Sequence, residues 1–205
     1  MKFVNVYEDS ERAKAYAELE FPGTYSLAYR DLPQIIQTHV LGKKALDFGC
    51  GTGRSTRFLK NLGFEVIGVD ISEQMIQKAR ARDPRGDYRL IADGDLRSFE
   101  DSMFDLVFSI FTFDNIPSME KKVTLFREFN RLLSKEGRII NLVSSPEIYR
   151  HEWVSFTTQD FPENHWAGLG DVVKIIMKDV RDIRPVEDIL WTEEGYQKVF
   201  LRAGL

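Results

Sequence analysis

The sequence is poor in the features that mark several classes of protein. One cysteine among 205 residues leaves no internal disulfide to form. No group of histidines, cysteines and acidic residues has a metal-ligand spacing, and we predict no metal site. No apolar run approaches the roughly 20 residues that span a bilayer, and the first residues, Met1–Asn5, carry no signal-peptide pattern. We therefore expect a cytoplasmic protein without a membrane partner.

An excess of positive charge is also lacking. The chain has 28 lysines and arginines against 32 acidic residues, a formal net charge of −4. Its densest basic group is interpreted as a solvated helix end and loop, and comprises Arg80, Arg82, Arg85 and Arg89. A nucleic-acid-binding domain normally shows a basic stripe or patch, so we predict no nucleic-acid partner.

Glycines are concentrated at one place. Gly49, Gly51 and Gly53 follow the apolar run Lys44–Phe48, which reads as a buried strand, and precede a helical pattern. Glycine is favoured where a backbone must adopt positive φ or approach a ligand closely. Asp70 ends the next apolar run, where its carboxylate can accept hydrogen bonds from two ribose hydroxyls. The pattern predicts a site for a ribose-bearing ligand at the strand ends of an open α/β sheet.

The glycine spacing narrows the choice of ligand. The dinucleotide fingerprint is G-x-G-x-x-G, whereas this chain has G-x-G-x-G preceded by Asp47. A carboxylate would repel a pyrophosphate but attract a sulfonium and an ammonium. The segment Leu46–Gly53 resembles the first motif of class I S-adenosylmethionine-dependent methyltransferases, and Gly68–Ser72 resembles their second.

That resemblance implies S-adenosylmethionine as the cofactor and S-adenosylhomocysteine as its product. It also implies an acid that accepts from the adenine amine, for which Asp93 is the better match and Asp95 the alternative. The cofactor-binding residues that we predict are Asp47, Gly49, Cys50, Gly51, Gly53, Asp70, Ile71, Met75, Asp93, Gly94 and Ile110.

Alternating strand and helix patterns predict a doubly wound, mostly parallel α/β sheet in a single domain, residues 1–205. We expect an N-terminal helical cap (1–39), a cofactor-binding core (40–145), a lid with an inserted β-hairpin (146–190) and a last helix (191–205). The expected strands are 44–48, 64–69, 88–92, 104–110 and 138–143, the last entered through a turn at 135–137. One helix is expected over 27–40, with Pro33 near its start or kinking it. The resembling family has seven strands, of which the last two have no counterpart here. Either the sheet is shortened or the hairpin occupies its edge.

The residues that would hold the methyl acceptor, at the acceptor end of the site, are less well marked in the sequence. Asp114 and Asn115 follow the fourth expected strand, and Asp114 can orient an acceptor or take its proton. The alternative is that both residues only form a turn before the helix capped by Ser118. His151 is a second candidate base. The predicted substrate pocket draws on aromatic residues of the cap, the fourth strand end and the lid, namely Tyr16, Tyr25, Phe111, Tyr149 and Trp153.

The leading hypothesis is in-line methyl transfer to a small molecule by a monomer or homodimer. A protein or RNA methyltransferase is one alternative, and it would need an extended or basic groove beside the site. A non-catalytic S-adenosylmethionine-binding regulator or partner subunit is another, and it would have a blocked acceptor pocket. An NAD-dependent oxidoreductase ranks last because of the glycine spacing and Asp47.

Overall fold

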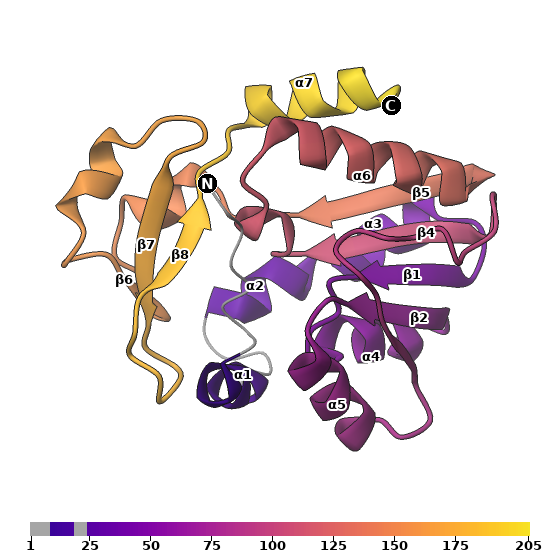
Figure 1. The fold of residues 1–205 in the computed structure, drawn as a ribbon, viewed down its shortest axis with the longest axis horizontal. Coiled ribbons are helices and arrows are strands. Elements are labelled where there is room, and N and C mark those ends of the chain that lie inside the picture. Colours follow the sequence, from indigo (N-terminus) through magenta and orange to yellow (C-terminus); the bar gives the residue numbers. More distant parts are fainter. Residues whose placement is uncertain (1–8, 19–23) are drawn as a thin grey trace.

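The computed structural model describes residues 9–18 and 24–205, which are arranged around two sheets (Figure 1). The larger sheet has five strands in the order β3-β2-β1-β4-β5, and its neighbouring strands pair in parallel. Its strands are β1 (Lys44–Phe48), β2 (Glu65–Asp70), β3 (Asp87–Leu90), β4 (Phe104–Ile110) and β5 (Leu133–Leu142). This arrangement confirms the predicted doubly wound, parallel α/β fold.

Helices cover both faces of this sheet. One face packs against α3 (Leu32–His39), α4 (Arg54–Asn61) and α5 (Glu73–Arg82), and the other against α6 (Met119–Leu132) and α7 (Glu193–Ala203). Phe126 and Phe129 of α6 are fully buried, and each contributes roughly 1.5–3 kcal/mol by leaving water. No helix among the described residues is both long and apolar enough to cross a membrane.

Side-chain caps begin three of the helices where the sequence predicted them. Ser72, Ser118 and Thr192 accept hydrogen bonds from the backbone N–H groups of Met75, Lys121 and Gly195. Each bond satisfies a donor that the first helical turn leaves free. These caps fix where α5, α6 and α7 begin, and α5 and α6 start directly beside the site described below.

Two sequence predictions were wrong in detail. The helix expected over 27–40 is two helices, α2 (Thr24–Arg30) and α3, separated at Asp31. Pro33 lies in the first turn of α3, where its missing N–H is harmless. β5 begins at Leu133 rather than at 138, and the expected turn is instead a shift in its pairing with β4 between Phe104 and Leu106.

The smaller sheet is antiparallel and consists of β6 (Phe156–Thr157), β7 (Val172–Met177) and β8 (Val186–Ile189). The predicted hairpin, β7–β8, therefore builds its own sheet, and the idea that it occupies the edge of the main sheet was wrong. Its apolar face packs against α1 (Ser10–Ala17) and α2. In Figure 1 the carboxyl ends of β1, β4 and β5 point toward this smaller sheet.

Candidate active site

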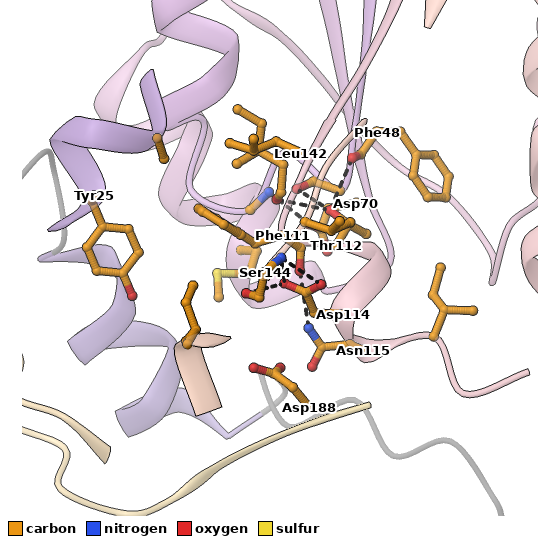
Figure 2. Close-up of a pocket in the computed structure, with 18 of the residues that line it drawn as sticks. Tyr25, Phe48, Asp70, Phe111, Thr112, Asp114, Asn115, Leu142, Ser144 and Asp188 are labelled. Atoms are coloured by element: carbon orange, nitrogen blue, oxygen red, sulfur yellow. Dashed lines mark hydrogen bonds between the residues drawn. The ribbon is translucent and has the colours of Figure 1, made fainter. Parts of the chain in front are cut away.

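A cavity of about 510 Å³ lies between the carboxyl ends of the parallel strands and the smaller sheet. The glycine loop and the ends of β2 and β4 line one part of it, and residues of β7 and β8 line another. The carboxyl edge of an open parallel sheet is the usual location of ligand sites in this type of fold. Figure 2 shows 18 of the residues that line the cavity.

The glycine loop folds tightly onto the neighbouring strands. The N–H groups of Gly49 and Cys50 both donate to the carbonyl of Val69, at 2.8 and 2.9 Å. Gly49 has a φ of +74°, and a Cβ there would lie 2.1 Å from Thr112 Oγ1. Only glycine fits this position, because a side chain would meet both the strain of positive φ and Thr112. The loop backbone thus reaches the cavity wall directly.

Asp70 connects the loop to the start of α5. The N–H of Gly51 donates to Oδ2 and the N–H of Ser72 donates to Oδ1, both at 2.8 Å. Burial raises the pKa of Asp70, and the two backbone hydrogen bonds oppose that rise. Each oxygen retains a lone pair for a ligand hydroxyl. The carboxylate is therefore held in place at the cavity, as a ribose-binding acid requires.

Asp47 lies behind the loop rather than in the cavity wall. Its side chain is fully buried, and Oδ2 accepts hydrogen bonds from Ser55 Oγ at 2.7 Å and Thr56 Oγ1 at 2.6 Å. Burial raises its pKa to about 6. Asp47 does not line the cavity, and its position supports anchoring of the loop to α4 rather than the predicted ligand contact.

Two other predicted loop positions also lie outside the cavity wall. A Cβ at Gly53 would lie 2.6 Å from the Tyr88 hydroxyl, so this glycine permits close packing under the loop. Cys50 is buried, and burial together with Asp47 raises the pKa of its thiol, which keeps it protonated and inert. Both residues support the loop conformation.

The far side of the loop combines apolar residues with an acid. Of the two candidate adenine acids, Asp93 lines the cavity, whereas Asp95 forms an ion pair with Arg97 and does not. Asp93 is itself paired with Lys121 at the start of α6. The remaining predicted residues in this part of the wall are Ile71, Met75, Gly94 and Ile110.

Two buried carboxylates mark the opposite end of the cavity (Figure 2). Asp114 lies on η2 (Phe113–Asn115) directly after β4, and its carboxylate accepts from the N–H of Ser144 at 3.1 Å and from its hydroxyl at 2.8 Å. Asp188 lies on β8, where Oδ2 accepts from the Tyr149 hydroxyl at 3.0 Å. Asp114 and Asp188 are 5% and 6% exposed. Burial raises the pKa of both, and the charge of Asp188 raises that of Asp114 further.

Sequence reasoning identified Asp114 but missed Asp188. The available signal was an acid at an inward position of an alternating strand, because Val186 and Asp188 are buried while Glu187 between them is exposed. Sequence reasoning also missed Lys122, which is fully buried beneath the site. Lys122 precedes Phe126 by four positions and Phe129 by seven, so it belongs to the buried stripe of α6.

The Lys122 ammonium lies in an aromatic environment. Nζ donates to the carbonyl of Phe113 and lies 4.6 Å from the ring centroid of Trp191 and 3.4 Å from the Tyr196 hydroxyl. Burial lowers the pKa of Lys122 to about 7, and the neighbouring Asp114 opposes that shift. Lys122 thus brings a positive charge near Asp114, but it does not line the cavity.

Three of the predicted aromatic wall residues line the cavity: Tyr25, Phe111 and Trp153. The ring of Tyr25 makes an edge-to-face contact with Phe156, at 5.4 Å between centroids. Phe111 has a φ of +58°, an uncommon backbone conformation for a bulky residue, at the point where β4 enters the site. The side chain of Tyr16, also predicted here, lies outside the described residues.

Two predictions on the lid were wrong. Tyr149 does not line the cavity, because its ring is only 2% exposed in the core beneath the smaller sheet and its hydroxyl binds Asp188. His151 also does not line the cavity, since its exposed ring lies on the surface with Nε2 2.9 Å from Glu147 Oε2. The short helix η3 (Pro146–Tyr149) directs Ile148 to the cavity instead.

Comparison with known proteins matches the part of the chain that forms the main sheet. Residues 46–141 match the methyltransferase domain family. Over 102 residues the chain is 36% identical to a demethylmenaquinone methyltransferase of Tropheryma whipplei, covering 48% of this chain and 41% of the relative. Over 106 residues it is 37% identical to the chloroplastic tocopherol O-methyltransferase of Arabidopsis thaliana, covering 48% and 29%. The chain thus spans less than half the length of either relative.

The fold as a whole has a counterpart among solved structures. The crystal structure of Streptomyces venezuelae DesVI superposes with a TM-score of 0.66 over 95% of this chain and 90% of that one, at 21% sequence identity. At this identity the likeness concerns the fold, and it includes the region of the smaller sheet because nearly the whole chain is covered.

Proposed function

We propose that this chain is a class I, S-adenosylmethionine-dependent methyltransferase and that it transfers a methyl group to a small molecule held against Asp114 and Asp188. The observation that carries the proposal is one cavity lined both by the glycine loop with Asp70 and by the two buried carboxylates. S-adenosylmethionine, when bound, supplies a methyl group already activated on a sulfonium. The chain's own residues then have to orient the acceptor, exclude water and take a proton where the acceptor carries one.

The donor end of the cavity, lined by Gly49, Asp70, Ile71, Met75 and Asp93, fits this cofactor. Asp70 offers oxygen lone pairs to ribose hydroxyls, and Asp93 offers them to an exocyclic amine. Ile71 and Met75 supply apolar surface for an adenine ring. The absence of a side chain at Gly49 brings the backbone to the ligand. These features support the predicted cofactor-binding set, apart from Asp47, Cys50 and Gly53, which do not line the cavity.

The acceptor end supports a small molecule. It lies within a cavity whose walls come from both sheets, and the smaller sheet contributes Phe156, Ile175 and Met177 to it. The named substrates of the two relatives, demethylmenaquinone and tocopherol, are small molecules as well. A regulator without activity would have no use for an open acceptor end with two buried carboxylates.

The proposal is tested by binding and then by transfer. Calorimetry should detect S-adenosylmethionine and S-adenosylhomocysteine binding to the purified chain, with NAD binding more weakly. A cell extract separated into small-molecule, RNA and protein fractions is then incubated with the chain and methyl-labelled S-adenosylmethionine. Label should appear in the small-molecule fraction. Label confined to RNA or protein would contradict the small-molecule assignment, and tighter NAD binding would contradict the cofactor assignment.

A further inference from the structure

We propose that the methyl acceptor is an amine that enters the cavity as an ammonium ion and gives its proton to Asp188. This inference rests on the proposed function and adds the chemical class of the substrate.

The buried charges at this end do not balance. Asp114 faces Ser144, Asp188, Lys122 and the hydroxyls of Tyr149 and Tyr196. Among these groups Lys122 is the only one that can carry a positive charge. One ammonium therefore faces two carboxylates, and a buried unpaired carboxylate is strongly unfavourable. A cationic ligand would supply the missing positive charge at the place where the cavity reaches Asp188.

One oxygen of Asp188 is positioned for such a ligand. Oδ2 accepts from the Tyr149 hydroxyl. In the part of the chain that the structure describes, no donor is within hydrogen-bond distance of Oδ1, although the side chain is 94% buried and lines the cavity. Figure 2 shows Asp188 approaching from a separate strand beside Asp114 and Asn115. An ammonium N–H can donate to this oxygen directly.

The aromatic residues of the cavity wall also favour a cation. Tyr25, Phe111, Trp153 and Phe156 line the same cavity, and the ring of Tyr25 makes edge-to-face contacts with Phe111 and Phe156. The faces of such rings attract ammonium groups, and the attraction is stronger where water is excluded. A wall of rings with carboxylates at one end fits an organic amine whose carbon skeleton contacts the rings.

Acceptors that react as anions fit this end poorly. A phenol or enol brings no positive charge, and once Asp188 has taken its proton the resulting anion and Asp114 still leave two negative charges at this end. A carboxylic acid that enters already ionised would add a third. An ammonium does the reverse, since Asp188 takes its proton and the free amine keeps a lone pair for attack. The nitrogen then forms a bond to the methyl carbon as the carbon–sulfur bond breaks, and the electron pair of that bond goes to sulfur. The positive charge passes to the nitrogen, next to the remaining carboxylate.

The first test compares ligands that differ only in this group. Binding of 2-phenylethylamine, 2-phenylethanol and 3-phenylpropionate is measured by calorimetry with saturating S-adenosylhomocysteine, together with matching alkyl amines, alcohols and acids. The amines should bind at least about 30-fold more tightly than their alcohol and acid counterparts, as expected for a buried ion pair. Methyl transfer from S-adenosylmethionine should follow the same order. Equal or tighter binding of the alcohols or acids would overturn the proposal.

The second test removes the charge of Asp188. Asp188→Asn keeps an oxygen that can accept from Tyr149, and it should lower amine affinity at least about 30-fold while leaving S-adenosylhomocysteine affinity unchanged. The control is Glu187→Gln, the adjacent residue of β8, whose side chain is exposed. Amine affinity that survives Asp188→Asn would overturn the proposal.

If the wild-type chain binds S-adenosylhomocysteine but no amine of the panel, the amine assignment is wrong and the methyltransferase assignment stands. If it does not bind S-adenosylhomocysteine at all, the proposed function itself is wrong. Ligand selectivity of the wild-type protein is informative even if Asp188→Asn does not fold.

Discussion

Asp114 and Asp188 meet at one end of the cavity although they belong to different sheets, Asp114 to the turn after β4 and Asp188 to β8. Each carboxylate adds negative charge to the buried site. Asp114 accepts a hydrogen bond from Ser144, and Asp188 accepts one from Tyr149. The pair exists only when the smaller sheet is docked on the main sheet. The donor end, by contrast, is built from the main sheet and its helices.

The carboxylate pair should make stability depend on pH. Burial raises the folded-state pKa of Asp188 above its ordinary value of 3.8, so the folded state binds more protons than the unfolded state and loses stability as pH rises from about 4 to 7. Asp188→Asn removes this loss of stability, and it also removes the negative charge that raises the pKa of Asp114. Urea unfolding at pH 5, 6 and 7 should show the variant gaining on wild type by on the order of 1–3 kcal/mol across that range. The stability of Glu187→Gln should depend on pH in the same way as that of the wild type. The same pH dependence for Asp188→Asn would contradict the prediction.

The glycine loop offers a comparison of strain with crowding. Gly49 and Gly63 both have positive φ, +74° and +82°, but a Cβ at Gly49 would overlap Thr112, whereas a Cβ at Gly63 meets nothing within 4 Å. Gly63→Ala should therefore lower the free energy of unfolding by about 1–2 kcal/mol, the usual strain of a left-handed alanine. Gly49→Ala should lower it by clearly more, and should also weaken S-adenosylhomocysteine binding. If urea denaturation shows equal losses of stability for the two variants, the Thr112 side chain can move away from a Cβ at position 49 without a measurable cost.

Asp70 is the residue that we expect to contribute most to ribose binding. Asp70→Asn should reduce S-adenosylhomocysteine affinity by about 1.5–3 kcal/mol, the usual value of hydrogen bonds to a charged group. The amide also loses an acceptor for either Gly51 or Ser72. The control is Asp95→Asn, an acid that pairs with Arg97 away from the cavity. Calorimetry that finds the two variants equal would contradict the ribose assignment.

Local signals in the sequence predicted much of the donor end. The run Phe104–Ile110 is a strand with those bounds, and Ser72, Ser118 and Thr192 cap helices as expected. Such features depend on residues close together in the chain. The depth of Asp47 was not predictable in this way, because the hydrogen bonds from Ser55 and Thr56 that hold it depend on how α4 folds back.

The acceptor end depends on contacts between distant segments, and there the sequence was less informative. The aromatic run after β5 predicted a wall, but helix η3 turns Tyr149 into the core and leaves His151 on the surface. Asp188 acquires its role only because β8 packs against η2. A pattern of alternating exposure in β8 identifies an inward acid but not the residue that it faces.

Lys122 provides the last prediction, because its charge is buried under the acceptor end. Its folded-state pKa is lowered to about 7 from 10.5, so the unfolded state binds more protons and wild-type stability should rise between pH 7 and about 10. Lys122→Met keeps the length of the side chain among the rings of Phe113, Trp191 and Tyr196 but has no proton to release. In urea unfolding the wild type should gain on this variant by roughly 1.4 kcal/mol per pH unit at most over that range. Lys198→Met, an exposed position on α7, is the matched control and should follow the wild type. If the two methionine variants show the same dependence on pH, Lys122 is not desolvated in the folded protein and cannot be the buried cation that faces Asp114.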